Sequence, residues 1–166
     1  PDRVEAFAKE IQDHLQDASY EQIKDYDALN LGTMKKWISK LKSTFDTEFG
    51  GYAFVPKFPL PNHLEFLLDY GSQEQDEMIE IHLRRTLFAM GYGGIYDHVE
   101  GGFSRYSTDA LWKVPHFEKM LYDNAQLIEL YSKAAMHTNS NSDFEFYGTI
   151  VNETFEYLKR NLKTNS

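Results

Sequence analysis

The stretch PHFEKMLYDNAQLIELYSKAAM, from Pro115 to Met136, decides the fold expected of this sequence. Its apolar residues recur every three or four positions, which is typical of an α-helix. Proline suits the first turn of a helix, because its missing N–H has no partner there. The apolar arc is too wide for one buried stripe, so this helix is predicted to pack on more than one side. The arc consists of Phe117, Met120, Leu121, Leu127, Ile128, Tyr131 and Ala135.

Five further helices are predicted around this one from the same spacing and from capping pairs at their starts. Their expected ranges are 2–15, 33–47, 62–71, 72–90 and 142–162. The capping pairs are Asp2 with Glu5, Asn62 with Glu65, Ser72 with Gln75, and Ser142 with Glu145. The polar stretch 18–32 is expected to be a linker, and no internal repeat is predicted.

Two long segments interrupt the helical pattern. Segment 46–61 contains glycines and prolines that do not fit a helix interior, and segment 91–114 is rich in glycine. Short hairpin strands are allowed within 92–112, where several aromatic and branched residues favour extended structure. The sequence therefore predicts an all-α, α/α-hairpin array of one domain, with both long loops at one end, where binding groups usually lie.

Composition excludes several classes of protein. The net charge is −9 and no long run of Lys or Arg occurs, which argues against nucleic acid and acidic membranes as partners. There is no cysteine, so disulfides, thiolate zinc sites and thiol nucleophiles are excluded. Histidines and carboxylates lack the spacing of a metal site, and no dinucleotide motif follows a strand. We expect a cytoplasmic protein without a membrane span, a signal peptide, a metal or a cofactor.

Two motifs resemble a known family. The stretch GGIYDHVEGGFSRYSTDALWKVPHFEKMLYDNAQL, from Gly93 to Leu127, closely resembles the YyaL-type thioredoxin-domain-containing proteins, which include mammalian spermatogenesis-associated relatives. The stretch GGYAFVPKFPLP, from Gly50 to Pro61, is similar to that family's second signature. Tyr52 and Val55 depart from the usual Phe and Ala, and Glu100 replaces a frequent Gly.

The resemblance implies a larger protein. Family members carry a thioredoxin-like domain before the helical region, and that domain is absent from these 166 residues. The helical region is similar to the six-hairpin toroids of N-acylglucosamine 2-epimerases and glycoside hydrolases. Residues 1–166 would then be the N-terminal half of an (α/α)6 toroid. A half toroid would expose apolar helix faces, so we expect self-association.

Five residues are candidates for acid–base chemistry. His116, at the predicted helix start, could be a neutral base, or it could cap the helix. Asp97 and His98 lie in a glycine-flanked turn, where Asp97 could transfer a proton or hold an Asx turn. Glu118 and Asp123 share the predicted helix with His116 and are carboxyl candidates.

Eight residues are candidates for substrate binding, because aromatic faces stack on sugars and cationic or amide groups bind their hydroxyls. Packing beneath the loop is the alternative for Arg105, Tyr106 and Trp112. For Lys57 the alternative is a snorkelling loop residue, and for Lys119 it is a buried ion pair with Asp123. The eight are Lys57, Tyr96, Arg105, Tyr106, Trp112, Lys119, Tyr122 and Asn124.

Three functions stay open from the sequence. The first is a carbohydrate-active enzyme, in which His98 or His116 would serve epimerisation and Asp97, Glu118 and Asp123 would serve hydrolysis. The second is a non-catalytic toroid that binds a protein partner or serves the thioredoxin-like domain. The third is an architectural clamp. The enzyme hypothesis requires Asp97, Arg105 and His116 to surround one water-accessible hollow.

Overall fold

The computed structural model describes residues 2–19 and 31–163, with side chains at 4–12 and 32–163. Within these ranges it contains helices and no strand, which confirms the all-α prediction. The helices are α1 (Asp2–Ser19), α2 (Leu31–Lys42), α3 (Pro61–Glu74), α4 (Glu77–Tyr92), α5 (Leu121–His137) and α6 (Asn141–Asn161). Most of the expected linker, 20–30, lies outside the described residues.

The chain divides into two compact units, Pro1–Lys40 and Leu41–Ser166. The first unit contains α1, whose described side chains at 4–12 are all exposed, including Val4, Phe7 and Ile11. All of the candidate site residues lie in the second unit.

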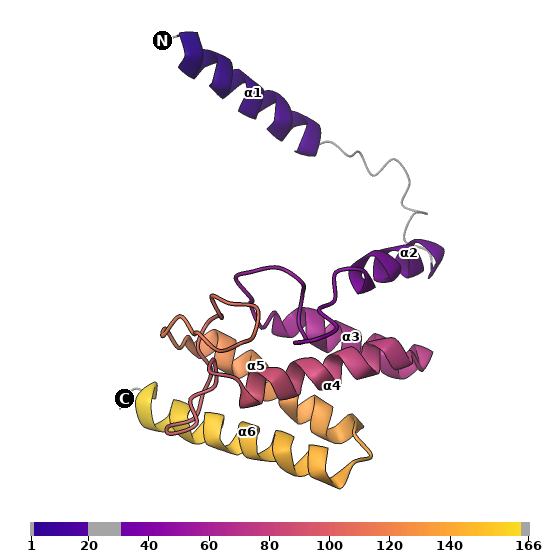
Figure 1. The fold of residues 1–166 in the computed structure, drawn as a ribbon, viewed down its shortest axis with the longest axis vertical. Coiled ribbons are helices and arrows are strands. Elements are labelled where there is room, and N and C mark those ends of the chain that lie inside the picture. The colour runs from indigo at the N-terminus through magenta and orange to yellow at the C-terminus, as the bar shows by residue number, and fades with distance from the viewer. Residues whose placement is uncertain (1, 20–30, 164–166) are drawn as a thin grey trace. The chain divides into compact units, whose positions relative to one another are not determined.

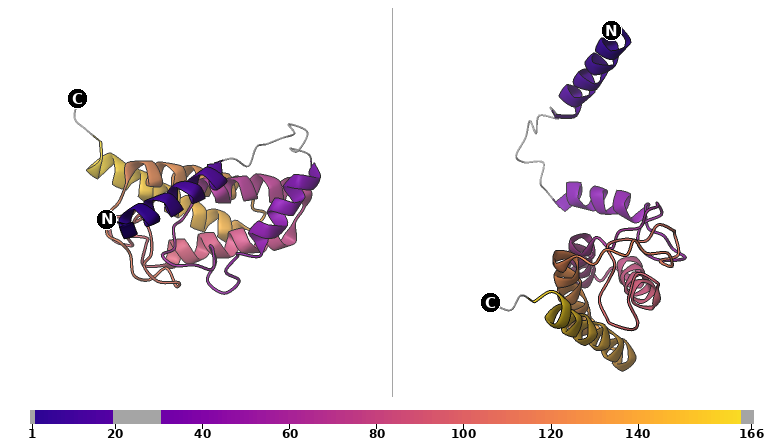
Figure 2. Two further views of the ribbon diagram at one scale, coloured as in Figure 1. Left: turned by 90° about the horizontal axis from the view of Figure 1, so that it is seen from above. Right: turned by 90° about the vertical axis from the view of Figure 1, so that its left-hand side faces the viewer.

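The second unit consists of two helical hairpins, α3–α4 and α5–α6 (Figures 1 and 2). α3 packs against α4, α5 packs against α6, and α3 and α5 join the two hairpins. α4 and α6 also meet, since the rings of Phe88 and Phe146 stack with centroids 4.4 Å apart. In Figure 1 the long loops gather at one end of the hairpins, and the short turns lie at the other.

The core lies between the four helices. Leu67, Ile79, Leu127 and Tyr131 are fully buried there. Burying each aliphatic side chain of this size contributes roughly 1.5–3 kcal/mol. The Tyr131 hydroxyl donates a 2.7 Å hydrogen bond to the Leu87 carbonyl and so satisfies its polar atom inside the core.

The start of α5 was predicted wrongly. The helix begins at Leu121, and Pro115 lies in an extended segment instead. The cause is pairing with a distant segment: the His116 N–H donates to the Tyr106 carbonyl at 2.9 Å, and the Arg105 N–H donates to the Glu118 carbonyl at 2.8 Å. His116, Glu118 and Lys119 are therefore loop residues and do not lie on a helix.

Three predicted capping pairs were also wrong. α3 begins with Pro61 after a Leu60 of positive φ, without a side-chain cap. α4 is capped by Asp76, whose side chain accepts from the Ile79 N–H. α6 is capped by Ser140, which accepts from the Asp143 N–H. At the remaining helices, α1 runs beyond residue 15, and α2 stops at Lys42 because residue 45 pairs with residue 52 in the following loop.

Candidate functional site

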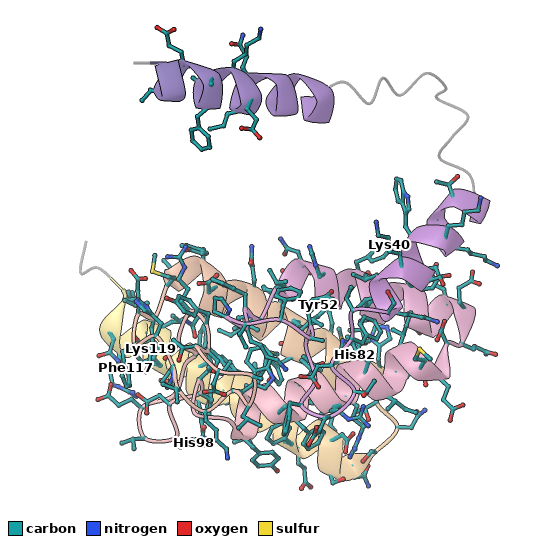
Figure 3. The ribbon with its side chains drawn as sticks, turned by 45° about the horizontal axis from the view of Figure 1, so that its top comes forward. Lys40, Tyr52, His82, His98, Phe117 and Lys119 are labelled. Carbon is teal, nitrogen blue, oxygen red and sulfur yellow. The ribbon has the colours of Figure 1, made fainter. Side chains whose placement is uncertain are left out.

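An extended segment, 115–120, organises the candidate site. Alternate side chains of an extended chain point to opposite sides. His116 and Glu118 lie on the side of Arg105 and Tyr106, whereas Lys119 contacts Asp97. Figure 3 shows Lys119 and Phe117 at the end of the hairpins where the long loops gather, with His98 farther down. The segment therefore has two faces with different partners.

The first face holds what we call the α5-start cluster: Arg105, Tyr106, His116, Glu118 and Asp123. The Tyr106 and His116 rings stack with centroids 4.8 Å apart. Oε2 of Glu118 lies 3.5 Å from Nη1 of Arg105 and 4.0 Å from Nδ1 of His116. The side chains of Arg105, His116 and Glu118 are each nearly half exposed, so a ligand can reach them.

Asp123 is the unusual member of the cluster. Its Oδ2 atom is buried and has no hydrogen-bond partner in the described part of the chain. Burial raises the pKa of Asp123; the charge of Arg105 acts in the opposite direction, and that of Glu118 raises it further. A carboxyl with a raised pKa retains its proton to higher pH and can serve as a proton donor.

The second face holds Asp97, which is fully engaged with its own loop. Its Oδ1 accepts hydrogen bonds from the N–H groups of Val99 and Glu100 at 2.9 and 3.0 Å. Its Oδ2 accepts from Nζ of Lys119 at 2.8 Å. The Lys119 hydrogen bond and those of the loop N–H groups lower the pKa of Asp97 to about 2. Asp97 is thus an ionised loop anchor.

Tyr96 and His98 flank Asp97 and also contact neighbouring structure. The Tyr96 hydroxyl donates a 2.5 Å hydrogen bond to Oε2 of Glu153 on α6. His98 is exposed, and its Nε2 lies 3.2 Å from the Gly93 carbonyl. Within the described ranges no hydrogen bond or ion pair joins Asp97 to Arg105 or His116. Asp97 and the α5-start cluster therefore have separate bonding partners, and a hollow shared between them stays a prediction.

Lys57 and Trp112 form a third, buried group. Nζ of Lys57 donates to Oδ2 of Asp46 at 2.5 Å and to the Gly50 carbonyl at 2.7 Å. It also lies 5.4 Å from the Trp112 ring centroid, and the Trp112 indole N–H donates to the Phe49 carbonyl. The Lys57 side chain is 1% exposed, so it is not accessible to a ligand.

Asn124 and Tyr122 lie in the first turn of α5 but differ in exposure. Asn124 is fully buried, and its amide accepts from the Phe103 N–H at 2.7 Å and donates to the carbonyls of Phe103 and Met120. The two hydrogen bonds with Phe103 attach the glycine-rich loop to α5. Tyr122 is half exposed and stays available to a ligand.

Two cavities of the second unit lie away from the α5-start cluster. One, of about 280 Å³, is at the opposite end of the hairpins and is lined by Arg84, His137, Asp143 and Tyr147 among others. The other, of about 270 Å³, lies between the Asp97 loop and α6, and is lined by His98 and Glu153 among others. Neither cavity is lined by a residue of the α5-start cluster, whose Arg105, His116 and Glu118 side chains are themselves exposed to solvent.

The described residues also bear on metals and membranes. No three His, Asp or Glu side chains among them are grouped so as to hold a metal ion. None of the helices over 2–19 and 31–163 combines the length and the apolar character needed to cross a membrane.

Comparison with known proteins now bears on the family. No family model matches the chain. Human spermatogenesis-associated protein 20 is 43% identical to it over 136 residues, and the rat protein is 42% identical over the same length. An uncharacterised protein of Caenorhabditis elegans is 35% identical over 130 residues. Each match covers 76% of this chain.

This chain is a relative of spermatogenesis-associated protein 20. It spans only 16% of the length of the human and rat proteins and 18% of the nematode protein. The relation agrees with the spermatogenesis-associated branch of the family expected from the two motifs.

Sequence reasoning missed several residues of this relative of spermatogenesis-associated protein 20. The Phe58 ring contacts Tyr106 in a tilted arrangement, with ring centroids 4.7 Å apart, and so extends the α5-start cluster. Asp46 is the counterion of the buried Lys57, and Glu153 is the acceptor for Tyr96. The signal for Asp46 was present, because Asp46 precedes a Gly-Gly pair in the same way as Asp97 does.

Proposed function

We propose that the α5-start cluster is a carbohydrate-binding site with an acid–base pair. The observation that carries the proposal is the buried, unpaired carboxyl oxygen of Asp123 next to a half-exposed group of polar and aromatic side chains. A buried polar atom without a partner costs free energy, and a functional role is a common reason for keeping it.

Aromatic rings and hydrogen-bonding groups in the cluster suit a sugar. Phe58, Tyr106 and His116 form a continuous row of rings: His116 stacks on Tyr106 with centroids 4.8 Å apart, and Phe58 is tilted against Tyr106 at 4.7 Å. Such a surface packs against the apolar face of a pyranose ring. Arg105 and Glu118 at its edge offer a donor and an acceptor for the hydroxyls.

The chemistry follows from the environments of the two carboxyls. Asp123, whose pKa is raised by burial, is the proton donor to a glycosidic or ring oxygen. Glu118, which lies beside Arg105 and is solvent-accessible, is the acceptor or the stabiliser of developing positive charge. Asp97 is outside this pair, because both its oxygens are engaged by its loop and by Lys119. The resemblance to toroid glycosidases and epimerases supports the same substrate class.

A titration of the 15N-labelled chain with N-acetylglucosamine and with glucose, followed by NMR, tests the proposal. We expect shifts of the amides in 105–106, 116–118 and 122–124. Glu118→Gln should weaken binding at least tenfold, roughly the value of one charged hydrogen bond. Glu129→Gln, at an exposed site further along α5, is the matched control and should bind as the parent chain does. Absence of shifts at millimolar sugar would refute the proposal.

A second candidate function is favoured by apolar side chains beside the cluster. Phe117 is 86% exposed and Leu121 is 54% exposed. Exposed apolar groups of this kind mark protein interfaces. On this alternative the same end of the hairpins binds a protein, for which the fused thioredoxin-like domain is the candidate. A pull-down with that domain separates the two, because Phe117→Ser should abolish capture and leave sugar-induced shifts unchanged.

A further inference from the structure

The larger of the two cavities lies at the end of the hairpins where the short turns are, away from the α5-start cluster (Figure 1). Its volume is about 280 Å³, and α3, α4, α5 and α6 all contribute to its lining. Since a cavity of about 150 Å³ holds benzene, a cavity of this volume accommodates roughly eleven non-hydrogen atoms. The size therefore suits a small molecule with one polar end and one short apolar chain.

The floor of this cavity is aliphatic. Leu83 and Leu87 of α4 and Ala134 of α5 line it and are almost completely buried. Tyr147 of α6 also lines it, but the Tyr147 ring packs within the core against Phe146. An aliphatic floor favours an alkyl chain over a pyranose, because sugars stack on open aromatic faces.

Two hydrogen-bond donors at the cavity have capacity to spare. Arg84 is held by Asp143, to which its Nε donates at 2.5 Å and its Nη2 at 3.0 Å. Nη1 of Arg84 has no partner within residues 31–163, and the Arg84 side chain is 61% exposed. A guanidinium that is already fixed in place loses little freedom when it binds a carboxylate.

The second donor is the hydroxyl of Tyr147. Tyr147 is 3% exposed, yet its hydroxyl forms no hydrogen bond with residues 31–163. Burial raises the pKa of Tyr147, the charge of Asp143 raises it further, and that of Arg84 opposes the change. The hydroxyl therefore keeps its proton and can donate it to a ligand oxygen. A buried polar group without a partner at the wall of a cavity indicates a ligand there.

Two acceptors line the same cavity. Glu80 of α4 is exposed and forms no ion pair or hydrogen bond with residues 31–163. Nδ1 of His137 lies 2.8 Å from the Lys133 carbonyl, so this nitrogen carries the hydrogen and Nε2 is the acceptor of the neutral ring. Asp143 is not a third acceptor, because both of its oxygens are bonded to Arg84.

We propose that this cavity binds a free α-amino acid with an aliphatic side chain, such as leucine. The ligand carboxylate accepts from Nη1 of Arg84 and from the Tyr147 hydroxyl. The ligand ammonium donates to Glu80 and to Nε2 of His137, and the alkyl chain lies on the aliphatic floor. A zwitterion matches a wall that offers both a cation and an anion. The site is independent of the α5-start cluster and of the function proposed for it.

Calorimetric titrations of the 166-residue chain with related ligands test the proposal. L-leucine should bind with a dissociation constant of about 1 mM or lower. N-acetyl-L-leucine, which lacks the ammonium, and L-leucinamide, which lacks the carboxylate, should each bind at least tenfold more weakly. Each of them leaves a charged group of the cavity without its partner. Glucose should give no binding heat.

Two substitutions identify the groups that hold the ligand. Glu80→Gln should weaken leucine binding at least tenfold and leave the affinity for N-acetyl-L-leucine unchanged, because the lost contact is the one to the ammonium. Tyr147→Phe keeps the ring in the core and should weaken leucine binding about fivefold, the value of one neutral hydrogen bond. Glu145→Gln, at an exposed position of α6 outside the cavity lining, is the matched control and should bind leucine as the parent chain does.

NMR spectra of each variant establish that the chain is folded before it is titrated. Absence of leucine binding at millimolar concentration would overturn the proposal. Equal affinities for leucine and N-acetyl-L-leucine would do the same, since the ammonium would then contribute nothing. Leucine binding that is unchanged in a folded Glu80→Gln chain, or that glucose matches, would also overturn it.

Discussion

The imidazole of His82 lies parallel to the ring of Phe45, with centroids 3.6 Å apart, inside the second unit. Its residue is 3% exposed, and neither ring nitrogen has a hydrogen-bond partner in the described structure. Burial, reinforced by the charge of Arg85, lowers the pKa of His82 to about 4. The folded chain therefore holds a neutral histidine that its unfolded form would protonate near pH 6.5.

The first prediction concerns pH. Because the pKa of His82 is lower in the folded state, its contribution to stability is present above pH 6.5 and is lost as pH falls towards 4. The loss should be on the order of 3 kcal/mol in the free energy of unfolding, measured by urea denaturation. His82→Phe should flatten the curve in this window. An unchanged slope in that variant would show that another group is responsible.

The second prediction concerns two ion pairs, Lys119 with Asp97 and Lys57 with Asp46. Asp97→Asn should lower the free energy of unfolding by about 2 kcal/mol, because Lys119, whose side chain is 14% exposed, loses its counterion. Asp46→Asn should have an equal or larger effect, since Lys57 is more deeply buried. Asp69→Asn, at an exposed position on α3, is the control. If Asp97→Asn and Asp69→Asn gave the same free energy of unfolding in urea, the ion pair of Asp97 with Lys119 would not stabilise the fold.

The third prediction concerns Asp123. Its pKa is raised in the folded state, so the ionised carboxyl weakens the fold above the unfolded pKa of 3.8. Asp123→Asn should therefore raise the melting temperature at pH 7 by about 2 °C, and it should abolish any acid–base activity. Calorimetry checks the first effect. A lower melting temperature would mean that the carboxylate stabilises the fold.

The fourth prediction concerns self-association. The 166-residue chain should associate with increasing concentration through the exposed apolar side chains of α6, among them Phe144 and Phe155. Phe155→Ser should reduce the association by about tenfold in sedimentation, because it removes one large apolar side chain from the contact. Met136→Ser, at an apolar site that is more exposed than Phe155, should leave it unchanged. A monodisperse parent chain at near-millimolar concentration contradicts this expectation.

Local sequence signals predicted which segments are helical and failed where distant segments pair. Pro115 suits a helix start, yet the segment after it is extended because residues 105–107 supply its hydrogen bonds. No local pattern contains that information. The helix begins six residues later, so His116 and Lys119 lie on opposite sides of an extended segment. His116 is near Glu118, and Lys119 binds Asp97.

The candidate site shows the same division. The sequence predicted the members of the α5-start cluster by residue type, and the structure places Arg105, Tyr106 and His116 beside Glu118 and Asp123. It could not separate Asp97 from them, since the partner that occupies Asp97 is 22 residues away. The likeness of the loops 46–51 and 97–102 was not predicted, because Lys57 follows Asp46 by 11 residues whereas Lys119 follows Asp97 by 22.

The hydrogen bonds of Lys57 and Lys119 also determine how fast these two amines are acetylated. An amino group that is held by a carboxylate and a loop carbonyl, and is largely shielded from solvent, does not reach a reagent readily. Lys57 and Lys119 should thus be the last amines to be acetylated in the native protein, and each should react only when its own glycine loop opens. The acetylation rates of these two side chains would measure separately, within one molecule, how often the Gly50 loop and the Gly101 loop open.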